Sequence, residues 1–372
     1  MRRPLALLSL VVLLGACGAL RETPVPSSPD TEAGPEATPE AALEAAPEAG
    51  PDDGPDALDG SATAAVGSAR TSSPDMPRPP SPDRGTRLRS TALTETSGLA
   101  VSRRDPGVLW AVNDGGHVPA LHALTRDGRP LGVWPLTVRD RDWEDLAAFR
   151  LDGEPFLLIA DTGDNARRRD GVVLHLVPEP VPRGPGAAPG ATLAPERSVR
   201  FRYEDGAHDV EAVAVDETTG TIWLLTKEPA RDGHGIAGGV YTLSLADFPD
   251  ADDADDADDA ARVARRAATL APVPRDLVSG LAAALTGIDL EQPTAFDIAA
   301  DGTSACLLTY RRVRCFERAD GEDWSETLVR PGRAFAPHGL AQAEALALSE
   351  DGETLFFTSE GPLPPLRVRR RR

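Results

Sequence analysis

One short pattern recurs five times after residue 95 and limits what this chain can fold into. In each copy, polar or acidic residues lead into alternating small apolar residues: TSGLAVS at Thr96, WEDLAAF at Trp143, VEAVAVD at Val210, TAFDIAAD at Thr294 and AEALALS at Ala343. A turn and a second apolar run follow each copy: VLWAVND, FLLIADTGDN, TIWLLTKE, ACLLTYRR and TLFFTSEG. Short strands repeated in this way predict a repeat architecture built from small antiparallel units.

Further strand-like runs extend these units to four strands, the pattern of a β-propeller blade. They include VVLHLVP with VRFRY, and VRCFERA with WSETLVR at 324–330. The last unit reaches only a third strand before the chain ends, so we expect residues 87–93 to supply its outer strand. The sequence therefore predicts an all-β propeller of five four-stranded blades. Six blades is the alternative, because the interval between the third and fourth copies is long; the Asp-Asp-Ala repeats at 250–261 within it are typical of an acidic surface loop.

The N-terminus has the features of an export signal. Met1-Arg2-Arg3 is followed by an apolar run that is short for a membrane span, and the run closes on Leu14-Gly15-Ala16-Cys17. This ending resembles a bacterial lipobox, which implies cleavage before Cys17 and attachment of the chain to a membrane through lipid, palmitate included, on that cysteine. Proline, alanine and glutamate dominate the next seventy or so residues, a composition typical of a disordered tether. The predicted organisation is a signal peptide at 1–16, a lipidated cysteine and tether at 17–86, and the propeller at 87–372.

Charge and cysteine content are consistent with export. The formal net charge is −20, which argues against a nucleic-acid partner for the fold as a whole. Beyond Cys17 the chain has only Cys306 and Cys315, on two successive predicted strands of the fourth blade. If the register places these two cysteines opposite each other, a cross-strand disulfide is within reach; two reduced core cysteines are the alternative.

The propeller pattern gathers polar residues on one face. The innermost strand of a blade begins on the face where the second strand ends, so both sets of residues meet around the central axis. We predict metal ligation by the acidic and amide residues Glu144, Asp145, Asp161, Asp164, Asn165, Glu211 and Glu344. We predict ligand contacts by Asn113, Asp114, Trp143, Tyr310, Arg311 and Glu360. Crowded carboxylates favour a bound cation or raised pKa values, and Ca²⁺ or another divalent cation is the expected cofactor. Turn chemistry is the competing explanation for each residue alone, because Asp and Asn are common where strands end.

The catalytic signal is weaker. No nucleophile-elbow, HExxH, CxxC or phosphate-loop motif occurs in the sequence. His208, next to Asp209 and Glu211, is the best candidate for a general base, and Lys227 would hold substrate charge.

The ordered set SGLA, LWAVNDGG, DWEDLA, IADTGDN, YEDGAHDVEA, LLTKE and TSEG resembles an uncharacterised family of secreted bacterial β-propellers. The resemblance covers roughly residues 95–362. That family is similar in architecture to phytase-like esterase and gluconolactonase-type propellers, whose metal-bearing funnels imply cation binding here by analogy of fold.

Three functions stay open on these grounds. The first is a membrane-anchored extracytoplasmic propeller that binds a divalent cation, a small polar ligand or both on its acidic face. The second is a metal-dependent esterase, lactonase or phosphoesterase that uses the same face. The third is a surface scaffold that binds another protein. The expected location is outside the cytoplasm on a bacterial membrane, which would be the outer membrane of a Gram-negative cell.

Overall fold

The computed structural model describes residues 86–182, 184, 189–227, 238–249, 262–272, 276–286 and 288–371. The predicted signal peptide, Cys17, the tether and the acidic run at 250–261 lie outside the described residues. Among the described residues, no helix combines the length and the apolar character needed to cross a bilayer.

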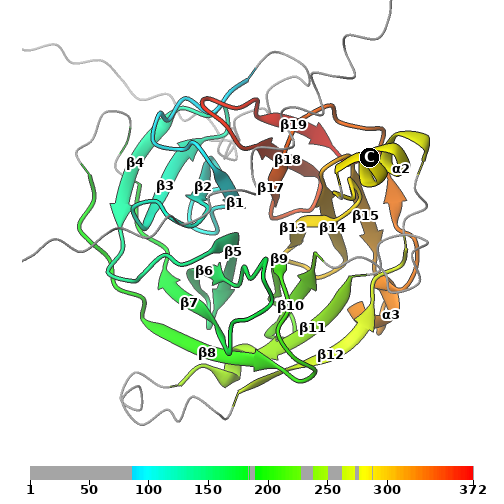
Figure 1. Ribbon diagram of the computed structural model, residues 1–372. Helices are drawn as coiled ribbons and strands as arrows, with labels where there is room; N and C mark the ends of the chain where they lie inside the picture. Colours follow the sequence, from blue (N-terminus) through cyan, green and yellow to red (C-terminus); the bar gives the residue numbers. More distant parts are fainter. Residues whose placement is uncertain are drawn as a thin grey trace, which may run out of the picture. The chain divides into compact units, whose positions relative to one another are not determined.

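The described chain is a β-propeller of five blades, which confirms the predicted fold class. Blade one contains β1 (Thr96–Val101), β2 (Val108–Asn113), β3 (Ala120–Thr125) and β4 (Pro130–Pro135), and blade two contains β5 (Trp143–Leu151), β6 (Glu154–Asp161), β7 (Val172–Pro178) and β8 (Arg197–Tyr203). Blade three contains β9 (Val210–Asp216), β10 (Thr221–Thr226), β11 (Gly239–Ser244) and β12 (Val263–Thr269), and blade four contains β13 (Pro293–Ile298), β14 (Ser304–Thr309), β15 (Val313–Glu317) and β16 (Arg333–Ala334). Blade five contains β17 (Ala343–Leu348), β18 (Thr354–Ser359) and β19 (Arg367–Arg370). Figure 1 shows the first strand of every blade, from β1 to β17, around the centre of the ring.

The core lies at the seams between blades. The innermost strands are buried along almost their whole length, because each packs between two neighbouring blades, whereas the outer strand β8 alternates buried and exposed residues. Apolar clusters fill the seams between adjacent blades, including Trp110 and Trp134 between blades one and two and Phe296 and Trp324 between blades three and four. The alternating small residues of the repeat therefore allow adjacent blades to approach closely around the axis.

Blades two and three are joined along their outer edges. β8 pairs with β12 in parallel, with Arg202 opposite Val263 and Tyr203 opposite Ala264. This pairing merges the two blades into one eight-stranded sheet. It also covers the backbone groups that two free outer edges would otherwise expose.

The ring closes between blade five and the N-terminal segment. Arg87 forms a single antiparallel bridge with Pro365, and the flanking residues Thr86 and Leu88 bond to Leu366 and Pro364. The segment at 87–93 therefore lies where its sequence predicted, but it contributes one bridge and buried leucines rather than a full outer strand.

The segment at 324–330 differs from expectation. It begins with a short helix, α3 (Trp324–Leu328), where the sequence pattern predicted a strand. Asp323 and Glu326 form a capping box at its start, which satisfies backbone N–H groups that a helix leaves open. Among the described residues, the two other helical elements are η1 (Leu245–Asp247) and α2 (Leu277–Thr286).

Cys306 on β14 lies directly opposite Cys315 on β15, and the two are joined by a disulfide. Both cysteines are buried at the seam between blades four and five. The bridge therefore links the second and third strands of blade four within the core.

Candidate functional site: an acidic funnel on the propeller axis

Every blade carries a β-bulge at the same position near the start of its first strand. The register between the first and second strands skips one residue in each blade: Ser97, Glu144, Glu211, Thr294 and Glu344, here called the bulge ring. A bulge leaves its extra residue out of the ladder and redirects its side chain, and bulges are common beside functional sites. Three of the five bulge residues are glutamates, a choice that a structural bulge does not require.

A second ring follows the ends of the second strands. Asp114, Lys227, Tyr310 and Glu360, the strand-end ring, come directly after β2, β10, β14 and β18. In three blades the backbone N–H of this residue bonds to the carbonyl two residues before the bulge: Asp114 to Glu95, Lys227 to Asp209 and Glu360 to Gln342. These bonds hold the two rings together at one end of the axis, which we call the funnel face.

Five carboxylates form the acidic cluster of this face: Asp114, Asp142, Glu144, Asp209 and Glu211. Within it, oxygens of Asp114, Asp142 and Glu144 lie within 4.8 Å of one another, as do oxygens of Glu144, Asp209 and Glu211. Glu144 is shared by both groups. Asp142 and Asp209 were not among the predicted ligands, although each stands two residues before a bulge glutamate, and this repeated spacing was the signal that would have found them.

The acidic cluster disfavours its own ionisation. Burial raises the pKa of Asp114 to about 7 and, together with neighbouring carboxylates, raises the pKa values of Asp142 and Asp209 to about 6. Burial and the nearby carboxylate of Glu211 raise the pKa of Glu144 well above its usual value. A cation bound among these groups would replace the protons that they otherwise retain.

One lysine partly balances this charge. Lys227 Nζ lies 2.8 Å from Glu211 Oε1, and it also lies over the ring of Tyr310. Burial lowers the pKa of Lys227, but Glu211 and further carboxylates raise it overall, so the ammonium stays charged. Tyr310 in turn donates its hydroxyl hydrogen to Glu344 Oε1 of the neighbouring blade at 2.9 Å. Lys227 thus serves as a fixed counter-charge for one glutamate, and Asp114, Asp142 and Glu144 lie in the part of the cluster beyond that ion pair.

Glu144 is the buried carboxylate at the centre of the acidic cluster. Its side chain is 7% exposed, yet it accepts no hydrogen bond from any residue in the described part of the chain. A buried carboxylate without a donor is costly, and oxygen ligands that converge in this way suit a hard cation such as Ca²⁺ or Mg²⁺. The hydroxyl oxygen of Ser97, at the same level of the bulge ring, is also buried without a partner among the described residues.

Asp145, next in sequence to Glu144, lies between blades rather than in the funnel. One carboxylate oxygen accepts N–H groups from Val213 at 2.8 Å and Phe296 at 3.2 Å, and the other accepts the N–H of Leu146. Its oxygens are therefore used to connect the innermost strands of blades two, three and four.

Asp161 is the last residue of β6, and Asp164 and Asn165 belong to the turn that follows it. Asp161 forms an ion pair with Arg169 at 2.7 Å, Asp164 accepts the N–H of Arg169, and Asn165 is exposed. The backbone N–H of Asp164 donates to Asp209 Oδ1 at 2.9 Å, so this turn helps to position one carboxylate of the acidic cluster.

Three of the residues predicted to contact a ligand have structural roles instead. The Asn113 side chain accepts the N–H groups of Thr94 and Glu95, Trp143 is buried between blades, and Arg311 pairs with Asp276 beside α2. The remaining predicted contacts, Asp114, Tyr310 and Glu360, all lie in the strand-end ring.

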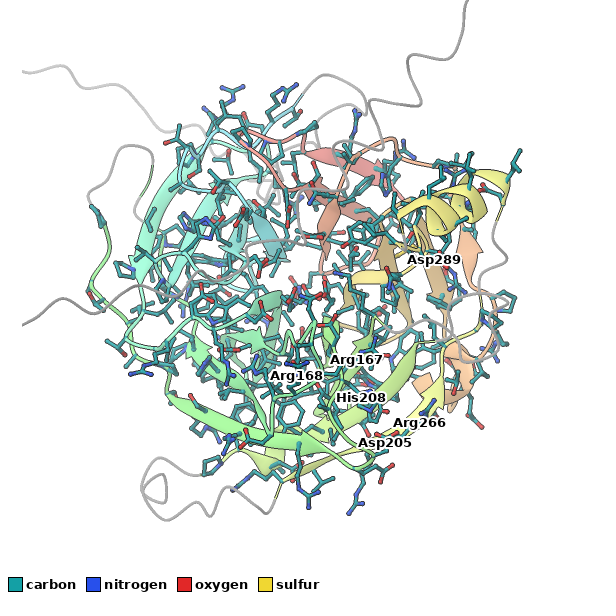
Figure 2. All side chains as sticks on the ribbon, in the orientation of Figure 1. Arg167, Arg168, Asp205, His208, Arg266 and Asp289 are labelled. Carbon is teal, nitrogen blue, oxygen red and sulfur yellow. A yellow bond between two sulfur atoms is a disulfide. The ribbon has the colours of Figure 1, made fainter. Side chains whose placement is uncertain are left out.

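The structure places the predicted base, His208, away from the axis. Its Nε2 atom lies 2.8 Å from Asp205 Oδ1 and 2.9 Å from the Tyr241 hydroxyl. Figure 2 shows His208 close to Asp205 and Arg266, farther from the centre of the ring than Arg167 and Arg168. His208 therefore borders a different part of this face from the one that Glu144 occupies.

Comparisons with known proteins add no function. No protein-family model matches the chain, and no curated protein matches it. Among solved structures, hydrazine synthase of Kuenenia stuttgartiensis is 13% identical, with 74% of this chain and 71% of that chain covered and a TM-score of 0.35. A nidogen/laminin complex is also 13% identical, with 72% and 73% covered and a TM-score of 0.32. Likeness at this level carries no information about what this chain binds, so function has to be argued from the funnel itself.

Proposed function

We propose that this protein is a propeller that binds a divalent cation, Ca²⁺ first among the candidates, in the acidic cluster of its funnel face, with a small polar ligand beside it. The observation that carries the proposal is the buried Glu144, which lacks a hydrogen-bond donor among the described residues and belongs to both groups of converging carboxylates. Glu144, Asp142 and Asp209 would supply most of the ligating oxygens. Lys227 remains paired with Glu211 at the edge of the site.

Thermal melts in EDTA, Ca²⁺ and Mg²⁺ test the cation. Selective binding raises the midpoint by mass action, and EDTA reverses the rise. Glu144→Gln is expected to remove the rise, because it deletes the carboxylate that both groups share. Glu350→Gln is the matched control, because Glu350 is exposed and lies between β17 and β18, outside the acidic cluster. This variant should respond as the unaltered protein does. If no cation shifts the midpoint, the metal site is refuted and a protein-binding scaffold becomes the better explanation.

We also propose export and attachment to a membrane through lipid on Cys17. The support is the sequence of residues 1–17 alone. Growth with labelled palmitate should label the unaltered chain in the membrane fraction, and Cys17→Ser should abolish both the label and the membrane association. Label that persists in Cys17→Ser would contradict the anchor.

Metal-dependent hydrolysis is the second candidate. It is favoured by the position of Asp114, whose carboxylate lies within 4.8 Å of those of Asp142 and Glu144 and would stand beside a bound cation as a general base or acid. Esters, lactones and phosphoesters are the substrates to screen with Ca²⁺ present. Turnover that needs the cation and falls strongly in Asp114→Asn would support hydrolysis, whereas cation binding without turnover would leave a binding protein.

A further inference from the structure

Helix α2 carries its large apolar side chains on its exposed side. Leu277 is 88% exposed and Leu285 is 61% exposed, and Val278 and Leu281 between them are exposed as well. These four residues, here called the apolar stripe, have the spacing of one helix face. No residue of α2 is charged, and the only residue that this helix buries is Ser279. The helix thus reverses the usual arrangement, in which a surface helix buries its leucines and exposes its polar residues.

The apolar stripe belongs to the funnel face. Asp276, just before α2, pairs with Arg311, which follows the strand-end residue Tyr310 of blade four. Figure 1 shows α2 at the periphery of the ring, away from the axis. Two further exposed apolar residues, Val118 after β2 and Leu363 after β18, lie in loops of the same face. The funnel face therefore presents apolar side chains at three places around the acidic cluster.

The composition of the apolar stripe indicates what covers it. Exposed apolar surface of this kind marks a contact with another protein or with a membrane. A stable protein interface buries about 800 Å² on each partner and is usually anchored by Trp, Tyr or Arg. The stripe offers only aliphatic side chains, on a helix without aromatic or charged residues. Hydrocarbon requires neither shape complementarity nor hydrogen bonds, so a short aliphatic stripe suits a lipid surface better than a protein partner.

The N-terminal part of the chain gives a reason for a bilayer to be near. Residues 1–85 precede the described fold, and the ending at Cys17 resembles a lipobox. An anchor there would keep the propeller within about 250 Å of a bilayer, the full span of about 70 extended residues. Because this confinement raises the local concentration of lipid, insertion of a short stripe needs no high intrinsic affinity.

Charge narrows the kind of lipid surface. The formal net charge of the chain is −20, and the acidic cluster lies on the same face as the apolar stripe. Anionic headgroups would therefore repel this face, whereas a zwitterionic surface leaves the apolar contribution unopposed.

We propose that the apolar stripe of α2 inserts into the surface of a zwitterionic lipid bilayer and thereby turns the funnel face toward it. The presence of a bilayer near the propeller rests on the proposed function, through Cys17, whereas insertion of the stripe can be tested without that anchor. Insertion would place the entrance of the funnel next to the headgroup layer.

Flotation with phosphatidylcholine vesicles tests the proposal. The protein to use is the chain from residue 17 onward with Cys17→Ser, which keeps every residue that the structure describes and lacks both the apolar N-terminal run and the lipid. We expect this protein to float with the vesicles. Leu281→Gln combined with Leu285→Gln should lower its partition coefficient at least about 10-fold, because two of the four inserting side chains are lost. Glutamine forms helices well, so the melting midpoint without vesicles should stay the same.

The matched control is Val181→Gln combined with Val329→Gln. Both valines are exposed but lie outside α2, after β7 and α3, so this variant should float as the unaltered protein does.

Each result decides the proposal. Absence of flotation, equal flotation of the α2 variant and the unaltered protein, or flotation that needs phosphatidylglycerol would overturn it. A dimer in sedimentation that the α2 variant converts to a monomer would also overturn it, because the stripe would then contact a second copy. Palmitate labelling reports on Cys17 separately: flotation without label keeps the lipid contact and rejects the anchor, and label without flotation does the reverse.

Discussion

At the scale of single residues, Asp114 links protonation to stability. Its pKa is raised by burial from 3.8 to about 7 in the folded protein, so between about pH 4 and 7 the folded state holds a proton that the unfolded chain has released. The free energy of unfolding should therefore fall as pH rises through this window. Asp114→Asn should flatten that slope and stabilise the protein at about pH 8, by at most about 4 kcal/mol for three pKa units.

Urea unfolding in EDTA at about pH 5 and about pH 8 measures this effect. Glu350→Gln, on an exposed carboxylate, serves as the control. Equal pH slopes for Asp114→Asn and the unaltered protein would show that Asp114 ionises normally in the funnel.

The sequence predicted the location of the funnel better than the arrangement of its individual side chains. Glu144, Glu211 and Glu344 were found because equivalent places in different blades carry the same unusual residue. The position of His208 could not be predicted from its sequence neighbours alone, because one of its partners, Tyr241, lies on β11, far from it in the sequence. Convergence of side-chain atoms from different strands is set by tilt and twist, which a linear pattern does not record.

At the scale of elements, the bulge in β5 gives two adjacent acidic residues opposite roles. Glu144 belongs to the acidic cluster, whereas Asp145 accepts backbone N–H groups from β9 and β13. Asp145→Ala leaves these buried donors unsatisfied and should lower the free energy of unfolding by about 2–5 kcal/mol. Glu144→Gln in EDTA should leave it unchanged or raise it, because the change removes a buried, unpartnered carboxylate.

Chemical denaturation of the two variants side by side checks this contrast. Similar losses in both would mean that the two carboxylates share one structural task. The sequence did not separate Glu144 from Asp145, because simple strand alternation cannot show where a bulge interrupts it. At 324–330 the missed signal was local: the Asp323 to Glu326 capping box was present in the sequence and outweighed the apparent strand pattern.

At the scale of the whole molecule, the ring depends on a few buried residues outside any strand. Leu88 is fully buried in the seam between blades five and one, next to the bridge at Arg87. Leu88→Ala should lower the free energy of unfolding by about 2–5 kcal/mol. Leu363→Ala, at an exposed leucine near the same junction, should change it little. Equal small effects in both would show that the N-terminal segment is dispensable for ring closure.

The architecture was the most predictable level. Five copies of one pattern predicted five blades, since each blade needs neighbours on both sides to bury its strands. The edge pairing of β8 with β12 was not predictable, because three other strands separate the two in the sequence.

That edge pairing also determines which carboxylates of the acidic cluster belong to one sheet. Asp142 and Glu144 lie at the start of blade two, and Asp209 and Glu211 lie at the start of blade three, so the continuous sheet bears or adjoins four of the five carboxylates. Asp114 extends from the separate sheet of blade one. A cation held by the cluster would therefore contact mainly carboxylates of the joined blades two and three, with Asp114 contributed by a separate sheet.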